Sequence, residues 1–149
     1  MALIDLITPD VVGVPLQSST KDDVIRELIN ILADAGKIEN AGQVYEAIMA
    51  REAKGSTGLE NGIAIPHAKT SAVSTLTVAL GISPGGIDFE AMDGQLSHLF
   101  FLILAAPDQS GPHIEALAEI ARLTRTKSFT QMLMEARTPE EAVEMFQEE

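Results

Sequence analysis

The sequence predicts an α/β fold in a single domain, and three observations lead to this prediction. Short apolar segments with strand-like patterns alternate along the chain with longer segments whose apolar residues recur at helical spacing. The length of 149 residues is that of one ordinary domain. With 46 % hydrophobic and 21 % charged residues, the composition is that of a globular protein. Because no linker, internal repeat or low-complexity tract interrupts the pattern, we expect residues 1–149 to form one domain.

The first third of the chain predicts one extended segment and two helices. Prolines and a glycine break up residues 1–19, where we expect an extended segment or strand over Val14–Leu16. A helix is predicted over Thr20–Gly36, because a hydroxyl N-cap and two acids precede a helically spaced apolar stripe and a glycine ends it. A second helix is predicted over Asn40–Arg51, again beginning at an N-capping side chain.

The middle of the chain predicts strands. Ile63–Ile65 is a short apolar strand that stops at a proline, and Leu76–Ile82 alternates large and small side chains like a strand with one packed face. Pro84–Gly86 is predicted to turn the chain, and Asp88–Gly94 to form a loop. The continuously apolar Leu99–Ala106 is typical of a central strand covered on both faces.

Three further helices are expected after the central strand. Pro112 suits the first position of a helix, and an apolar stripe follows it. A shorter helix passes through Phe129, Met132 and Leu133. Thr138–Glu141 is a capping box with proline in the first turn, so it begins a last helix. Strands interleaved with helices indicate a sheet with helices on both faces.

Charge and composition exclude several classes of function. The formal net charge of −12 argues against a nucleic-acid partner and against anionic membrane surfaces, and favours a basic protein partner. The chain has no cysteine, so it has no disulfide and no thiolate metal site. No signal peptide is evident, and the longest apolar run, Leu99–Pro107, is shorter than the roughly 20 residues of a membrane helix. We therefore expect a cytoplasmic location.

The segment from Arg51 to Thr70 carries the strongest functional signal. A Gly-rich turn, Gly55–Gly58, precedes the strand Ile63–Ile65, and His67 follows directly after the proline that ends this strand. Backbone N–H groups of such a turn form concavities that bind anions, and strand ends hold side chains at the rim of a sheet. The pattern therefore predicts a histidine beside an anion cradle.

This segment resembles the phosphoryl-acceptor motif of enzyme IIA of the sugar phosphotransferase system, of the fructose and mannitol type. The family's pattern is an Arg-Glu pair, a Thr-Gly turn and then Gly-Ile-Ala-Ile-Pro-His-Ala, and all parts occur here in order. Leu59-Glu60 replaces the Ile-Gly of many members and brings a carboxylate near the site. The resemblance continues through Gly86–Phe89 and Asp93-Gly94 to Gly111–Ile114, so it covers nearly the whole chain. It implies a mixed sheet of five strands, whose order the pattern alone does not determine.

The resemblance implies a phosphoryl carrier. His67 would accept a phosphoryl group from a phosphohistidine of the small carrier HPr, as a tele-phosphohistidine, and pass it to a cysteine of enzyme IIB. The protein would then be a phosphotransferase component of fructose type that needs no cofactor and no metal. Because the chain has neither a cysteine nor a membrane segment, we expect it to act as a separate component together with a membrane-embedded IIC permease.

Each candidate site residue also has a structural interpretation. Arg51 is either a solvated cation at a helix end or a planar donor to phosphoryl oxygens. Ser56, Thr57 and Gly58 are either turn residues or contacts of the phosphoryl group. His113, which we expect in the first turn of a helix, is either exposed there or donates to His67 or to a phosphoryl oxygen.

The two other candidate side chains, His98 and Lys69, and two alternative classes of function also have sequence-based expectations. His98 is expected to be a surface or packing residue, and Lys69 is either solvated or faces a partner. A zinc hydrolase is disfavoured because the three histidines are widely spaced and no His-x-x-x-His occurs. The serious alternative is a nitrogen-type regulatory IIA, which keeps the acceptor histidine but acts as a phosphorylation-dependent protein-binding switch. Ala68–Thr70 and Gly86–Phe89 favour the fructose branch.

Overall fold

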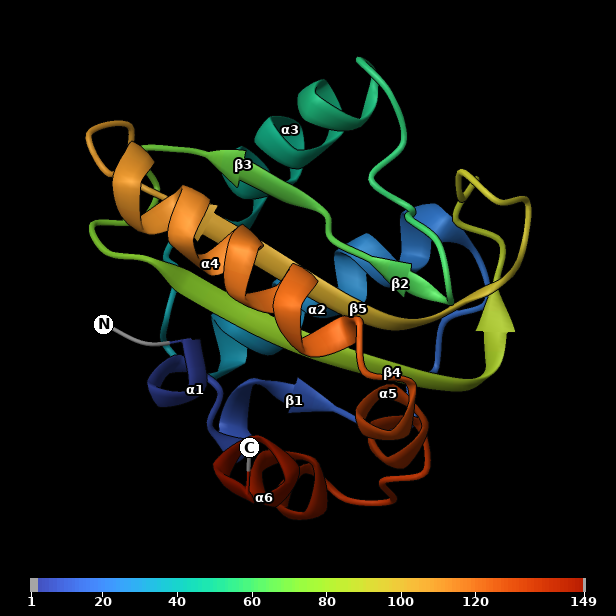
Figure 1. Cartoon of the computed structure of the whole chain (residues 1–149). Helices are drawn as coiled ribbons and strands as arrows, with labels where there is room; N and C mark the ends of the chain where they lie inside the picture. Colours follow the sequence, from blue (N-terminus) through green and yellow to red (C-terminus); the bar gives the residue numbers. More distant parts are fainter. Residues whose placement is uncertain (1–2, 149) are drawn as a thin grey trace.

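The structure is a computed structural model that describes residues 3–148 of the chain. A mixed sheet of five strands forms its centre, in the order β1-β4-β5-β2, with β3 also paired to β5. The strands are β1 (Val12–Gly13), β2 (Ile63–Ala64), β3 (His67–Lys69), β4 (Thr77–Ile87) and β5 (Ser97–Ala105). Figure 1 shows β4 and β5 as the two long strands in the middle of the molecule. The prediction of an α/β fold with a mixed sheet is confirmed.

The two short strands β2 and β3 lie along the same edge of β5. Both run parallel to β5, with Ile63 opposite Leu99 and His67 opposite Ile103. Between them, the carbonyl of Pro66 still accepts the Ile103 N–H at 2.9 Å. The pair β4 and β5 is antiparallel, whereas β1 is parallel to β4. His67 therefore begins a strand of its own, where the sequence predicts only the residue after a strand end.

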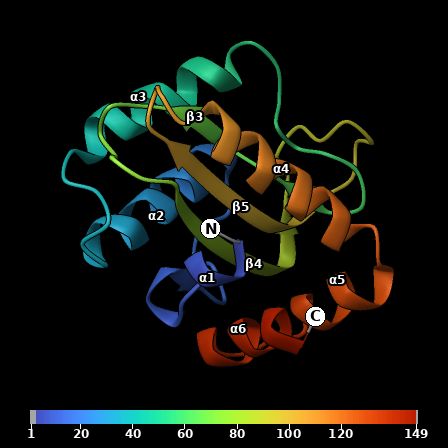
Figure 2. The ribbon, with the colours of Figure 1, turned by 60° about the vertical axis from the view of Figure 1, so that its left-hand side comes forward.

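Helices cover both faces of the sheet. They are α1 (Leu3–Leu6), a 3-10 turn η1 (Pro9–Val11), α2 (Lys21–Asp34), α3 (Ala41–Glu52), α4 (Ser110–Thr124), α5 (Lys127–Met134) and α6 (Pro139–Glu148). The predicted caps are present: the side chains of Thr20, Asn40 and Thr138 accept N–H groups of the first turns of α2, α3 and α6. In Figure 2, α2 and α3 lie on the opposite side of the sheet from α4.

The central strand β5 separates two hydrophobic cores. Its side chains alternate between them because successive residues of a strand point to opposite faces. One core lies under α1, α4, α5 and α6 and receives Leu99, Phe101 and Ile103. The other lies under α2 and α3 and receives Phe100, Leu102 and Leu104. A strand buried on both faces explains the unbroken apolar run in the sequence.

Three local predictions are wrong. The N-terminal strand is Val12–Gly13, earlier than the expected Val14–Leu16, because Pro15 has no N–H to extend the ladder along β4. The chain does not turn at Pro84–Gly86, which lies inside β4 where the register with β5 shifts. Proline and glycine are tolerated at such an irregularity, and Gly86 adopts a φ of 81° there. Helix α4 begins at Ser110, so Pro112 lies within its first turn and does not open it.

Candidate functional site

The segment after α3 runs back along the free edge of β2. The Leu59 N–H donates to the Ile63 carbonyl at 2.7 Å, and the Ile65 N–H donates to the Thr57 carbonyl at 3.0 Å. Gly58 forms an antiparallel bridge with Ala64. These bonds hold the Gly-rich turn beside the short strand that leads to His67.

The ring of His67 is half-buried and held by the main chain. Its Nδ1 lies 2.7 Å from the carbonyl oxygen of Ile65. Because a carbonyl oxygen only accepts hydrogen bonds, Nδ1 carries the proton in the neutral ring and Nε2 keeps the lone pair. The backbone of the residue two positions earlier thus selects the tautomer in which Nε2 is the nucleophile.

The second histidine of the site, His113, packs edge-on against the first. The ring centroids of His67 and His113 lie 5.3 Å apart at an interplanar angle of 68°. The two rings are therefore neighbours, and the role of His113 toward His67 or a phosphoryl oxygen stays a prediction. His113 lies in the first turn of α4, the helix that Figure 1 shows beginning near β3.

His113 is buried at 6 % exposure, and its Nε2 has no hydrogen-bond partner among the described residues. Burial lowers the pKa of His113 below its ordinary value of 6.5, and the nearby charges of His67 and Lys69 lower it further. A buried imidazole nitrogen without a partner is costly, so this atom is able to form a hydrogen bond with a group that enters the site.

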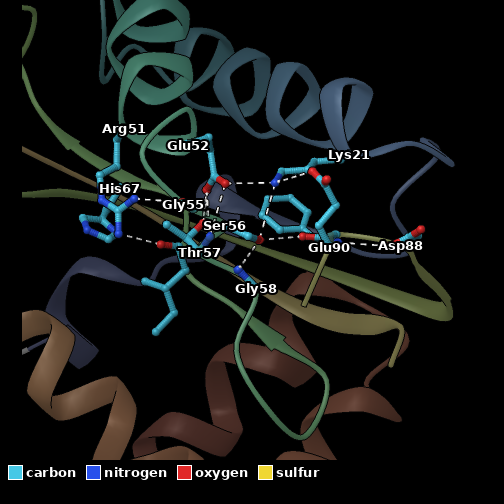
Figure 3. Close-up of polar contacts among 12 residues, drawn as sticks. Lys21, Arg51, Glu52, Gly55, Ser56, Thr57, Gly58, His67, Asp88 and Glu90 are labelled. Atoms are coloured by element: carbon cyan, nitrogen blue, oxygen red, sulfur yellow. Dashed lines mark hydrogen bonds and ion pairs between the residues drawn. The ribbon is translucent and has the colours of Figure 1, made fainter. Parts of the chain in front are cut away.

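Arg51 lies in the last turn of α3, which packs against β3. One of its guanidinium nitrogens, Nη1, donates to the Gly55 carbonyl at 2.9 Å. Figure 3 shows the Arg51 and His67 side chains at the same end of the close-up. The guanidinium has five N–H donors, so the bond to Gly55 leaves other donors available for an anion.

In the turn predicted to be an anion cradle, most N–H groups already donate hydrogen bonds to acceptors within the chain. The Gly55 N–H donates to the Glu52 carbonyl, and the Gly58 N–H donates to the Ser56 hydroxyl, both at 3.0 Å. Both the N–H and the hydroxyl of the buried Thr57 donate to the Glu52 carboxylate. In this structure Gly55, Thr57 and Gly58 therefore have their N–H groups satisfied within the chain.

Two residues of this region carry no functional prediction from the sequence. The sequence motif contains Glu52 only as part of the Arg-Glu pair, yet its side chain is 4 % exposed and forms an ion pair with Lys21 at 3.0 Å. An acid three residues before a Gly-rich turn is the signal that could identify Glu52, since turn N–H groups need an acceptor. Lys21 offers no such signal, because its place in the first turn of α2 is typical of a solvated side chain.

The remaining candidates lie apart from the histidine pair or at its margin. The Nδ1 of His98 lies 3.0 Å from the Ser83 carbonyl, so it joins β5 to β4, as expected of a packing residue. The Nζ of Lys69 is exposed and donates to the Ser110 hydroxyl at the start of α4 at 2.6 Å. Residues 3–148 contain no group of three or more His, Cys, Asp or Glu side chains placed to hold a metal ion.

The comparison with known protein families identifies the family of the chain. Residues 5–149 match the family described as the phosphoenolpyruvate-dependent sugar phosphotransferase system, EIIA 2. The chain therefore belongs to this EIIA 2 family, and phosphoryl transfer is its general chemistry. No helix of the described part of the chain combines the length and apolar character needed to cross a membrane.

Two relatives named as fructose-specific are similar to the chain. It is 36 % identical over 145 residues to the fructose-specific EIIABC component of Bacillus subtilis, covering 97 % of this chain and 23 % of the length of that relative. The fructose-specific EIIA component of Haloferax volcanii is 36 % identical over 134 residues, covering 89 % of this chain and 87 % of its own length.

Two solved structures are also similar to the chain, and the first is a nitrogen regulatory protein. The nitrogen regulatory protein IIA-Ntr from Neisseria meningitidis superposes with a TM-score of 0.88 at 27 % identity, covering 96 % of this chain and 97 % of its own. A complex of enzyme IIAMTL with phosphorylated enzyme IIBMTL from Escherichia coli gives a TM-score of 0.78 at 21 % identity, covering 94 % and 96 %. This second likeness shows the shared fold.

Proposed function

We propose that the protein accepts a phosphoryl group on Nε2 of His67 and passes it on to a partner. The observation that carries this proposal is the bond between Nδ1 of His67 and the Ile65 carbonyl, which leaves the lone pair on Nε2. The Nε2 lone pair forms the new N–P bond while the bond from phosphorus to the donor's histidine nitrogen breaks. The donor's nitrogen keeps the electron pair of the broken bond. Nδ1 of His67 keeps its proton, which remains hydrogen-bonded to the Ile65 carbonyl.

The neighbouring donors are suited to the charge on the transferred group. Phosphoryl transfer depends on positioning and on stabilising charge at the three equatorial oxygens. On this proposal, Nε2 of His113 donates to one of these oxygens. This oxygen would supply the hydrogen-bond partner that Nε2 lacks among the described residues. Arg51 contributes its free guanidinium N–H groups. Ser56, Thr57 and Gly58 stay predictions as phosphoryl contacts, and their present hydrogen bonds favour a role in shaping the turn.

The partners that we propose are those that the family resemblance suggests. The donor is a phosphohistidine of an HPr-type carrier, and the acceptor is a cysteine of an enzyme IIB that works with a membrane IIC permease during uptake of fructose. The fructose-specific names of two relatives support this assignment. The net charge of −12 favours a basic carrier, because opposite charge speeds encounter. The cytoplasmic location stays a prediction that this set of partners would require.

The second candidate function is a nitrogen-type regulatory switch. The high structural similarity to IIA-Ntr from Neisseria meningitidis favours it. On that proposal the same phosphorylation of His67 controls binding of another protein, and no phosphoryl group reaches a sugar. Capture of partners by the unphosphorylated protein, compared with the phosphorylated protein, separates the two functions. Phosphate flow to IIB and fructose favours the carrier.

The experiment that tests both candidates is phosphorylation in vitro followed by intact-protein mass spectrometry. Incubation with phosphoenolpyruvate, enzyme I and HPr should add one phosphate that is labile in acid and stable in base. His67→Ala should take up none, whereas the matched control His98→Ala should take up phosphate like the parent protein. Uptake by His67→Ala at the parent level would show that another residue is the acceptor.

A further inference from the structure

An ion pair between the partly exposed Lys21 and the buried Glu52 lies beside the Gly-rich turn and has no role in the transfer chemistry above. The Lys21 Nζ and the Glu52 Oε2 are 3.0 Å apart, with side chains that are 17 % and 4 % exposed. The cost of desolvating two such charges commonly equals or exceeds their attraction. A gain in stability is therefore a weak explanation for the presence of this ion pair. A role in positioning neighbouring groups explains it better.

The pair joins three separate segments of the chain. Lys21 begins α2, Glu52 ends α3, and the Nζ of Lys21 also contacts Glu90 at 3.0 Å and lies 4.7 Å from the centre of the Phe89 ring. Burial by itself would lower the pKa of Lys21, but the hydrogen bonds and charges of Glu52 and Glu90 outweigh it and raise the pKa. Lys21 is therefore protonated at this junction, and Figure 3 shows its contacts with Glu52 and Glu90.

Hydrogen bonds that are linked through the backbones of Thr57 and Ile65 connect Glu52 to His67. The Glu52 carboxylate accepts both the N–H and the hydroxyl of Thr57. The Thr57 carbonyl accepts the Ile65 N–H at 3.0 Å, and the Ile65 carbonyl accepts Nδ1 of His67 at 2.7 Å. Glu52 thus fixes the peptide of Thr57, and this peptide fixes the strand residue that orients the His67 ring.

The same turn also holds the guanidinium of the site. The Gly55 carbonyl accepts Nη1 of Arg51 at 2.9 Å, and the Ser56 hydroxyl donates to the Phe89 carbonyl at 2.8 Å. The Lys21 Nζ lies 3.5 Å from that hydroxyl. One shift of the turn would therefore move both Arg51 and the carbonyl that selects the tautomer of His67.

We infer that Lys21 and Glu52 are positioning residues for phosphoryl transfer, which hold the turn 55–58 so that the Nδ1–H tautomer of His67 is the populated one. This inference rests on the proposed function of His67. Neither residue touches the phosphoryl group; each acts through Thr57 and the Ile65 backbone. The rate of transfer is sensitive to them because small displacements of reacting groups cost large factors in rate, roughly 100-fold for about 1 Å.

Four variants test the inference. Glu52→Gln keeps the side-chain shape and an acceptor oxygen for Thr57 but removes the charge that pairs with Lys21. Lys21→Met removes the cation and keeps the length, and Lys21→Arg is the conservative variant that keeps the charge. The double variant Lys21→Met/Glu52→Gln removes both charges. Because Lys21 is partly exposed, its variants keep the test available if Glu52→Gln does not fold.

Two measurements are made on each folded variant. The first is the ¹⁵N NMR spectrum of the His67 imidazole, which reports the tautomer and needs no phosphoryl donor. The second is the rate of phosphoryl transfer from phospho-HPr, divided into kcat and KM. Glu52→Gln and Lys21→Met should increase the Nε2–H tautomer and lower kcat by roughly 10- to 100-fold with KM nearly unchanged. Lys21→Arg should restore most of the parental kcat.

The double variant and a control complete the design. If the two residues act through one network, the double variant is no slower than the slower single variant. Arg26→Met, which breaks an exposed ion pair with Asp22 on the same helix, should leave tautomer and kcat unchanged. Folded variants with the parental tautomer and kcat would overturn the inference. A parent protein that takes up no phosphate would instead overturn the proposed function, while the NMR spectra still decide the role of Lys21 and Glu52.

Discussion

Replacing Arg51 by alanine should separate a role in phosphoryl transfer from a role in folding. The side chain is partly exposed at the end of α3 and makes one hydrogen bond, to the Gly55 carbonyl. Exposed helix-end cations contribute at most about 1 kcal/mol. For a chain of this length such a loss lowers Tm by about 2–4 °C. The folded protein should therefore be nearly as stable as the parent.

The effect of Arg51→Ala on transfer should be much larger. Removing one donor that stabilises charge in a transition state costs about 100- to 1,000-fold in rate. Rapid-quench transfer from phospho-HPr, with the phosphoprotein quantified by mass spectrometry, measures this rate beside a thermal melt. Arg125→Ala is the matched control, because Arg125 caps the opposite end of α4 from His113 and is exposed. A fall in Tm beyond about 10 °C with parental transfer would show that Arg51 is structural.

Three further predictions follow from the site. Gly58→Ala should destabilise the protein by about 1–3 kcal/mol in urea unfolding, because its Cβ would lie 2.9 Å from the backbone of Ala91 and Phe89; parental stability would contradict this packing. Because the folded pKa of His113 is depressed, its contribution to stability is complete above the ordinary pKa of 6.5 and is lost as the pH falls from that value through the lower pKa of the folded state. Stability curves of His113→Gln should therefore fall less steeply below that pH than those of the parent, and identical slopes would exclude His113 as the cause. Transfer from purified phospho-HPr should continue in excess chelator, since residues 3–148 offer no metal-binding group; loss of transfer that added metal restores would refute this.

The layered architecture could be predicted from local patterns. The caps at Thr20 and Asn40 and the apolar run of β5 are determined by neighbouring residues, so they needed no knowledge of the rest of the fold. The predictions of a strand at Val14–Leu16 and of a turn at Pro84–Gly86 are wrong for a common reason. Whether a proline or a glycine ends a strand depends on which neighbouring strand needs its N–H, and that partner is distant in sequence.

The sequence by itself determined the class of fold and the motif around His67, and the family pattern that it carries predicted a role for His113 beside this residue. These depend on residue types at short spacings and on a family pattern carried by them. Only the tertiary structure decided that the Gly-rich turn already satisfies its own N–H groups through Glu52, and that Lys21 closes this network from another helix. The physical reason is that hydrogen bonds and ion pairs form between whichever groups the packed sheet and helices bring together. Their partners are therefore chosen by distance in space, and distance along the chain does not reveal them.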